Sequence, residues 1–146
     1  MTHTIPVFDG FCLPHAVNRM DVGGRDCTSY LQKTLMDEGV SLTSSAEFEI
    51  ARGIKEKYCK VSQRFASDLE HKTGYERTSH TLPDGQIINI NSQQIRVPEI
   101  LFDPAMIGYD EKGIHQMIAG FTFINQISRI FRRNSYGTIY LRKKNR

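Results

Sequence analysis

Three charged residues, an arginine, a lysine and a glutamate, are spaced so that a single helix would present them together. Arg52, Lys55 and Glu56 stand at positions i, i+3 and i+4, which share one face of an α-helix. A guanidinium and an ammonium can donate hydrogen bonds to a polar or anionic ligand, while the carboxylate can accept them from hydroxyl groups. The same spacing also fits an exposed helix with ordinary charge pairs, and the spacing alone favours that plainer interpretation.

A capping signal and an apolar repeat predict the helix that would carry these residues. Ser44-Ser-Ala-Glu47 matches a capping box, in which a serine hydroxyl and a glutamate carboxylate satisfy free backbone N–H groups. Behind it, Ala51, Ile54, Tyr58 and Val61 recur at spacings of three and four residues, as the buried stripe of an amphipathic helix does. We therefore predict a helix over residues 44–60, with the charged residues on a different face.

Turn residues and apolar periodicity divide the rest of the chain into short elements. Asp9-Gly10 lies between two apolar runs and is a strong hairpin signal, and Gly39 ends a stretch with helical spacing. A helix over 96–102 would hold Pro98 in its first turn. The other predicted elements are strands over 4–8, 11–22, 86–90 and 137–141, helices over 25–38 and from 114 onward, a polar surface connection over 63–79, and a loop over 104–109.

The composition is that of one ordinary globular domain. Of the 146 residues, 39% are hydrophobic and 24% charged, which excludes a disordered or fibrous protein. No apolar run approaches the roughly 20 residues of a membrane-spanning helix, and we see no secretory signal, so we expect a cytoplasmic protein that does not enter a membrane. The three cysteines include no C-x-x-C pair, and we predict neither a disulfide framework nor a metal site. Cys59 is expected to be an inert thiol.

The net charge of +3 conceals a basic end. Seven of the 19 lysines and arginines follow residue 128 and no aspartate or glutamate does, so the other 12 basic residues face 16 acidic ones. A basic tail can bind nucleic acid, but no motif of interleaved aromatic and basic residues accompanies this one. We therefore do not expect a nucleic-acid-binding protein.

Short motifs in the first 116 residues follow one another in a recognisable order. They are Pro6-Val-Phe-Asp-Gly-Phe11, Leu13-Pro-His-Ala16, Gly24-Arg-Asp26, Ile54-Lys-Glu-Lys57, Leu82-Pro-Asp-Gly-Gln86, Val97-Pro-Glu99 and Gly113-Ile-His115. In order and spacing this set resembles actin and its close relatives, and so many motifs in register leave little room for chance agreement.

The resemblance implies a mixed α/β fold, part of the ribonuclease H-like ATPase architecture that actin shares with Hsp70 and sugar kinases. Residues 1–23 match strands of the inner lobe of the second actin half, residues 24–112 match its small outer lobe and return segment, and residues 113–146 would form a divergent helix and a basic tail. The first actin half, with its phosphate-binding hairpin, has no counterpart in this sequence, and the second such hairpin would precede Thr2. We therefore expect a truncated actin-like chain.

Four residues match family positions that contact the adenosine of ATP, namely Gly24, Arg52, Lys55 and Glu56. This match reverses the preference for the plainer interpretation of the charged helix face, and it implies ATP and Mg²⁺ as the family's ligands. Gly24 would also open a helix, where free N–H groups favour anions. His3 matches a histidine that orders water near the γ-phosphate, but because its catalytic neighbours are missing we do not expect it to act here.

Met106, Ile107, Gly108 and Tyr109 match a loop that packs between strands in the actin filament. An apolar loop tip flanked by acidic residues suits a protein partner, although the same loop could be tucked against its own domain. By resemblance, the role is ATP binding and filament formation in the cytoskeleton, with actin, further copies of the chain and actin-binding proteins as partners.

The expectation for the chain itself is narrower. The phosphate hairpins and the glutamine that positions the attacking water have no counterpart here, and phosphoryl transfer relies on positioning, a metal ion and oriented water. We therefore do not expect it to be a competent ATPase on its own. Two alternatives remain open: a non-enzymatic interaction module that binds actin or its partners, and a truncated gene product without function.

Overall fold

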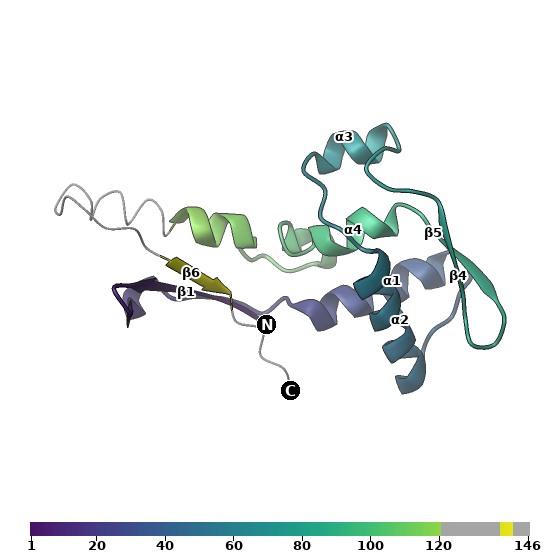
Figure 1. Cartoon of the computed structure of the whole chain (residues 1–146), viewed down its shortest axis with the longest axis horizontal. Helices are drawn as coiled ribbons and strands as arrows, with labels where there is room; N and C mark the ends of the chain where they lie inside the picture. The colour runs from purple at the N-terminus through teal and green to yellow at the C-terminus, as the bar shows by residue number, and fades with distance from the viewer. Residues whose placement is uncertain (121–137, 142–146) are drawn as a thin grey trace. The chain divides into compact units, whose positions relative to one another are not determined.

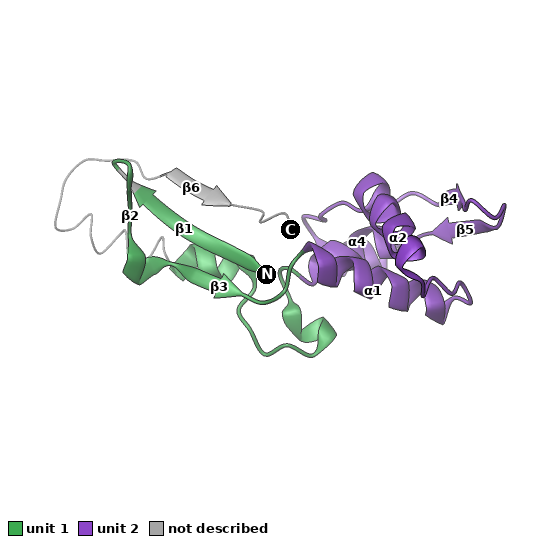
Figure 2. Cartoon of the chain, turned by 90° about the horizontal axis from the view of Figure 1, so that it is seen from below, with its two compact units in different colours: residues 1–23, 101–146 green, residues 24–100 purple. Residues whose placement is uncertain are grey.

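The chain divides into two compact units. The computed structural model describes residues 1–120 and 138–141, and Figure 1 labels its elements. Unit 1 contains residues 1–23 and 101–146, and unit 2 contains residues 24–100 (Figure 2). The expected basic tail at 142–146 and the divergent segment after residue 120, up to β6, lie outside the described residues. Unit 2 carries the four predicted adenosine contacts, and unit 1 carries His3 and the predicted filament loop.

Two long helices form the frame of unit 2. The structure confirms the helices predicted over 25–38 and 44–60 as α1 (Gly24–Asp37) and α2 (Ser45–Tyr58). Gly39 follows α1 with a φ of +89°, the left-handed conformation that glycine adopts at little cost after a helix. The N–H of Gly39 donates to the carbonyl of Met36 at 2.9 Å and so closes the last turn.

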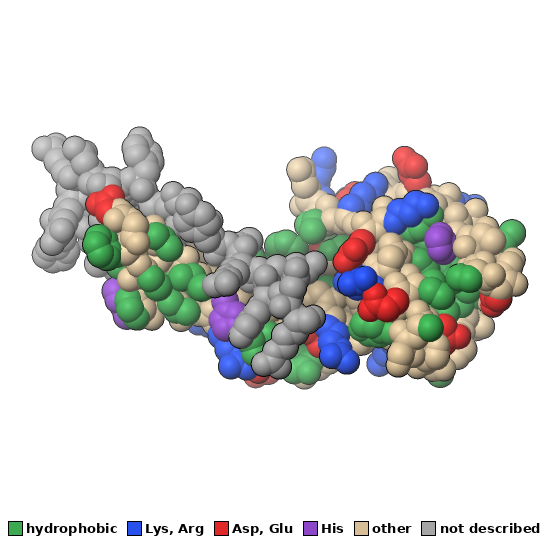
Figure 3. All heavy atoms as spheres, turned by 60° about the horizontal axis from the view of Figure 1, so that its bottom comes forward, with side chains coloured by type: hydrophobic (Ala, Val, Ile, Leu, Met, Phe, Trp, Pro, Cys, Tyr) green, Lys and Arg blue, Asp and Glu red, His purple; other side chains and the backbone are tan. Residues whose placement is uncertain are grey.

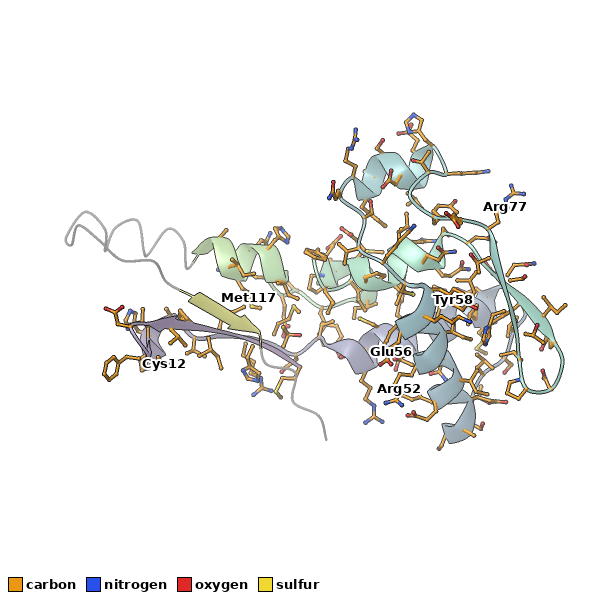
Figure 4. All side chains as sticks on the ribbon, in the orientation of Figure 1. Cys12, Arg52, Glu56, Tyr58, Arg77 and Met117 are labelled. Carbon is orange, nitrogen blue, oxygen red and sulfur yellow. The ribbon has the colours of Figure 1, made fainter. Side chains whose placement is uncertain are left out.

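The core of unit 2 lies where α1, α2 and the shorter α4 (Gln93–Glu99) pack together. Its fully buried side chains are Leu31, Leu35, Ala51, Ile54, Ile88, Ile90, Ile95, Val97 and Ile100. Burying one such large aliphatic side chain contributes about 1.5–3 kcal/mol. Ala51 and Ile54 confirm the predicted stripe of α2, whereas Tyr58 is half-buried and places its hydroxyl 3.1 Å from His80 Nδ1 (Figure 4). The prediction was wrong for Val61, which is 57% exposed because α2 ends before it, at Tyr58.

A two-stranded hairpin contributes buried side chains to the core of unit 2. β4 (Thr78–Thr81) pairs antiparallel with β5 (Ile87–Ile90), with His80 opposite Ile88. The turn between them contains Gly85 at a φ of +87°. Along β5, Ile88 and Ile90 are buried while Ile87 and Asn89 are exposed, which is the alternation expected of a half-buried strand and confirms the strand predicted over 86–90.

The short helix near Pro98 begins earlier than the sequence suggested. We expected residues 96–102 with the proline in the first turn, but α4 spans Gln93–Glu99 and holds Pro98 near its end. Because proline has no N–H, the carbonyl of Gln94 loses its helical donor. The backbone N–H of Lys60 donates to that carbonyl at 2.9 Å instead, so the proline position is compensated from outside the helix.

The segment expected to be an irregular connection, residues 63–79, contains a helix and the start of a strand. α3 (Phe65–Glu70) begins two residues into it, and β4 starts at Thr78. The expectation was wrong because α3 buries no side chain fully and therefore shows no apolar stripe. Polar contacts of Asp68 hold this segment instead, with hydrogen bonds from Ser62 at 2.5 Å and Thr73 at 3.0 Å.

Unit 1 is built around one central strand. β1 (Thr2–Phe8) pairs antiparallel with β2 (Phe11–Cys12), β3 (Asn18–Met20) and β6 (Thr138–Leu141). Asp9 at a φ of +47° and Gly10 at +81° form the predicted hairpin turn between β1 and β2, as a type I′ turn requires positive φ at both positions. β6 confirms a strand in the region predicted over 137–141.

The strand predicted over 11–22 is interrupted. β2 ends at Cys12, a 3₁₀ turn η1 occupies Pro14–Ala16, and β3 follows. Pro14 stands in the first turn of η1, where its fixed φ favours a helical turn over an extended strand. Elsewhere in unit 1, η2 (Pro104–Ile107) occupies the predicted loop and residues 114–120 are helical.

None of the helices within residues 1–120 and 138–141 has an apolar run of membrane-spanning length.

Candidate functional site

The start of α2 is fixed by the predicted capping box. Ser44 is the N-cap: its hydroxyl accepts from the N–H of Glu47 at 3.2 Å, and its own N–H donates to Glu47 Oε2 at 2.7 Å. The N–H of Thr43 also donates to that carboxylate at 2.7 Å. These hydrogen bonds hold the pKa of Glu47 below its ordinary value. The cap fixes where α2 begins, and the burial of Ala51 and Ile54 decides which face of the helix points outward.

The charged residues of α2 lie on the solvent side of the buried stripe. Arg52 and Glu56 are exposed, whereas Ala51 and Ile54 of the same helix are buried. Figure 4 shows Arg52 and Glu56 projecting from the same side of α2. Figure 3 shows basic and acidic side chains interleaved on one face of unit 2, so no single sign of charge dominates it. The predicted helix face therefore exists and is open to a ligand.

Lys55 links this face to the first turn of α1. Its ammonium donates to the carbonyl of Gly24 at 2.7 Å and to the hydroxyl of Thr28 at 2.9 Å. An ammonium has three donors, so one N–H remains for another acceptor. The structure thus brings Gly24 and Lys55 together.

Arg52 and Glu56 do not pair with each other. The guanidinium of Arg52 lies 2.6 Å from Glu49, and both side chains are more than half exposed. Such an exposed i, i+3 pair contributes little to stability. Within residues 1–120 and 138–141, the carboxylate of Glu56 takes part in no ion pair or hydrogen bond, so both of its oxygens can accept from a ligand.

Gly24 is not required by packing inside unit 2. A Cβ added there would meet one atom, Lys55 Nζ, at 3.8 Å, which is an ordinary van der Waals distance. Its φ is not positive. The absence of a side chain at the start of α1 therefore leaves backbone open on the exposed side rather than relieving a clash.

Thr28 belongs to this arrangement and was missed by sequence reasoning. It lies one turn after Gly24 in α1, is buried, and also donates its hydroxyl to the carbonyl of Gly24 at 3.1 Å. The i, i+4 spacing of Gly24 and Thr28 could have suggested that they share a face. The partner on α2 could not have been found without the packing of the two helices.

Burial keeps the two cysteines of unit 2, Cys27 and Cys59, in the thiol form. Cys27 on α1 is buried, and burial raises its thiol pKa to about 11. Burial likewise raises the pKa of Cys59, which caps the end of α2, to about 12. Thiolates are the nucleophilic form, so both stay protonated at neutral pH, as was expected of Cys59.

His3 belongs to unit 1, whereas the α1–α2 face belongs to unit 2. It stands on β1 opposite Arg19 of β3 and is half-buried. Among the described residues no three His, Cys, Asp or Glu side chains converge as metal ligands would. The structure gives His3 a place in the sheet and no side-chain partner in the described ranges.

The predicted filament loop forms a 3₁₀ turn with an exposed aromatic tip. Gly108 follows η2 with a φ of +84°, and its N–H donates to the carbonyl of Ala105 at 3.0 Å. Met106 and Ile107 are half-buried, while Tyr109 is 45% exposed. The loop is therefore partly tucked against unit 1 and partly presented to solvent.

Known proteins match this chain across both of its units. The family model described as Actin matches residues 1–139. Centractin from Schizosaccharomyces pombe is 44% identical over 117 residues, an alignment that covers 79% of this chain and 31% of the relative. The chain thus spans about a third of the length of this relative. The match runs across the mixed helices and small sheets of units 1 and 2, and this chain belongs to the actin family.

Proposed function

We propose that the α1–α2 face of unit 2 is the adenosine-contacting part of an actin-type ATP site. The observation that carries the proposal is the pair of hydrogen bonds from Lys55 to Gly24 and Thr28. They hold the Lys55 ammonium at the start of α1, and the exposed carboxylate of Glu56 is the next residue of α2. Membership of the actin family supports ATP as the ligand.

The residues present fit the adenosine half of ATP. Glu56 has two free carboxylate oxygens that suit ribose hydroxyl donors, and Lys55 keeps one unused N–H. Arg52 can leave its weak surface pair with Glu49 at small cost. When bound, ATP with Mg²⁺ supplies the phosphate anhydride that is hydrolysed. The described residues include no cluster of acidic or histidine side chains to hold Mg²⁺, so we assign them to the nucleoside and not to the metal.

We further propose that this chain alone binds an adenine nucleotide weakly and does not hydrolyse it. Hydrolysis needs an oriented water and a metal-bound phosphate, for which we assign no residue here. In the setting of a whole actin-type subunit, the same face would serve ATP-dependent filament building in the cytoskeleton of the cytoplasm.

Binding of adenosine monophosphate to the ¹⁵N-labelled chain tests the site by NMR. We expect saturable shifts at the start of α1 and along α2, weakened about tenfold by Glu56→Gln because a charge-assisted hydrogen bond is lost. Glu70→Gln, at an exposed position of α3, is the matched control and should change nothing. If the Glu56→Gln variant binds with the same affinity as wild type, the site proposal is contradicted. Phosphate release from ATP above a buffer blank would refute the proposal that the chain does not hydrolyse ATP.

A second candidate function is favoured by the loop of Met106–Tyr109. Tyr109 is an exposed aromatic side chain at the tip of a turn fixed by Gly108, and aromatic residues are enriched in protein interfaces. A module that binds actin filaments through this loop should pellet with preformed filaments, and Tyr109→Ala should lower the bound fraction several-fold. Recovery of the wild-type chain in the supernatant alone would oppose this function and favour a product without a role in filaments.

A further inference from the structure

A cavity in unit 2 lies away from the residues assigned to adenosine. It has a volume of about 550 Å³ and is lined by Lys72, Tyr75, Arg77, Asn89 and Asn91. This volume falls in the range of small-molecule sites. The cavity shares no lining residue with the α1–α2 face, and sequence reasoning gave these five residues no role.

One wall of the cavity is the turn over residues 72–75, which hydrogen bonds to Asp68 hold in place. The carbonyl of Asp68 accepts from the N–H of Thr73 at 2.9 Å, and its carboxylate accepts from the Thr73 hydroxyl at 3.0 Å. Within this turn Lys72 holds a φ of +54°, which is uncommon outside glycine. Gly74 adopts +75°, and a Cβ there would lie 2.6 Å from Asp68 Oδ2. The turn is therefore held in one conformation, with Lys72 at the cavity.

The other wall is the end of the β4–β5 hairpin, and a buried glutamine joins the two walls. Gln94 is 4% exposed, and its side-chain amide donates to the carbonyl of Glu76 at 2.5 Å and to that of Ile90 at 2.8 Å. Glu76 stands between Tyr75 and Arg77, and Ile90 stands between Asn89 and Asn91. One amide thus fixes both pairs of lining residues.

The chemistry of the lining selects a negatively charged ligand. The two charged residues are both cations, and no acidic side chain lines the cavity. Within residues 1–120 and 138–141, neither Lys72 nor Arg77 forms an ion pair. Figure 4 shows Arg77 at the end of the hairpin nearest α3. An arginine fork and a lysine ammonium are the side chains that bind phosphate best, and the two asparagine amides add neutral donors.

We propose that this cavity binds the phosphate group of a small ligand. Lys72 and Arg77 contact the phosphate oxygens, the amides of Asn89 and Asn91 donate to the same group or to its ester oxygen, and Tyr75 offers an aromatic face beside it. A free phosphate ion and an aromatic phosphate ester carry this group equally, and the ester alone uses the tyrosine ring.

Two probes test the cavity on the full-length ¹⁵N-labelled chain by NMR: inorganic phosphate and phenyl phosphate, at constant ionic strength. We expect saturable amide shifts confined to residues 72–77 and 89–91. Lys72→Gln and Arg77→Gln should each weaken binding about tenfold, as expected for the loss of a charged hydrogen-bond donor. Tighter binding of phenyl phosphate that Tyr75→Leu abolishes would identify the aromatic ester as the ligand type, and equal binding of both probes would identify free phosphate.

Lys33→Gln is the matched control because Lys33 is an exposed cation of the same unit on α1. It should leave binding unchanged. All three charge variants lie at exposed positions, and unchanged amide spectra without probe would confirm that they fold. Shifts spread over surface lysines, no saturation, or saturation that survives Lys72→Gln and Arg77→Gln would overturn the proposal. The adenosine proposal is independent, because its shifts would centre on α1 and α2.

Discussion

The ammonium of Lys55 lies 2.9 Å from the hydroxyl of Thr28, so a residue of α2 secures the first turn of α1. The same ammonium binds the carbonyl of Gly24 at 2.7 Å. Lys55 therefore has a structural role in unit 2 that is separate from any ligand. This relationship explains why the two helices present one continuous surface.

Removal of the Lys55 ammonium should destabilise unit 2. Lys55→Met keeps most of the side-chain volume but removes the ammonium that donates to the Gly24 carbonyl and the Thr28 hydroxyl, and we expect a loss of about 1–2 kcal/mol in the free energy of unfolding. Urea denaturation followed by circular dichroism measures it. Lys33→Met on the exposed side of α1 is the control, and equal midpoints for the two variants would show that the contacts of Lys55 carry no stability.

The contribution of the α2 N-cap to the stability of unit 2 should also be measurable. Ser44→Ala removes the hydroxyl that accepts from the N–H of Glu47, and a lost N-cap costs about 1 kcal/mol. Ser45→Ala, one residue later and exposed, removes a hydroxyl without removing the cap. If both variants unfold at the wild-type urea concentration, the capping box does not contribute to stability.

Acid should weaken the fold through Glu47 and Asp68. Hydrogen bonds lower the pKa of Glu47 below 4.5, and hydrogen bonds from Ser62 and Thr73 lower that of Asp68 below 3.8. Because each pKa is lower in the folded state, the stabilisation is complete above the unfolded values and is lost as the pH falls through the folded ones. Stability measured between pH 5 and pH 2 (about the range set by these carboxyl groups) should fall less steeply in Asp68→Asn than in wild type. Parallel curves would contradict the assignment.

A buried hydroxyl in unit 1 offers a stabilising substitution. Thr4 is 4% exposed, and its hydroxyl has no hydrogen-bond partner among the residues that the structure describes. An unpaired buried polar group costs about 1–3 kcal/mol, so Thr4→Val should raise the thermal midpoint. Thr28→Val is the opposite case, because its hydroxyl is bonded to both Gly24 and Lys55, and it should lower the midpoint. A decrease in both variants would show that the Thr4 hydroxyl is satisfied in solution.

The three thiols should differ sharply in reactivity. Cys12 is exposed, whereas burial raises the thiol pKa of Cys27 to about 11 and that of Cys59 to about 12. At neutral pH a chromogenic disulfide reagent should therefore modify one thiol rapidly in the native chain and all three in urea. Cys12→Ser should abolish the rapid phase. A rapid phase that persists in this variant would show that unit 2 opens readily.

The parts of the molecule that were predicted from sequence are those with local signals. The capping box at Ser44 and the buried stripe of Ala51 and Ile54 act within one helix, so they can be found without knowing the fold. The face of Arg52, Lys55 and Glu56 follows from the same register. The role of these residues toward adenosine stays a prediction.

The parts that were missed depend on contacts between distant segments. Because Pro98 has no N–H, the carbonyl of Gln94 accepts a hydrogen bond from the N–H of Lys60, more than 30 residues away in sequence. No local sequence pattern predicts that hydrogen bond. The segment containing α3 is held by the carboxylate of Asp68 rather than by apolar burial, so its helix has no hydrophobic period to detect. Lys72 and Arg77 line one cavity with Asn89 and Asn91, and the Gln94 amide that bonds to both Glu76 and Ile90 could not be predicted from any local pattern.

The pairing of β1 with β6 has a consequence for biosynthesis. β1 is translated before its partner over Thr138–Leu141, and the residues between the two strands include all of unit 2. The whole of unit 2, residues 24–100, is a single uninterrupted stretch that is completed in the interval, at about 5–20 residues per second. We therefore expect unit 2 to fold during translation, independently of unit 1. Until β6 is translated, the edge of β1 that pairs with it stays unpaired and accessible to chaperones.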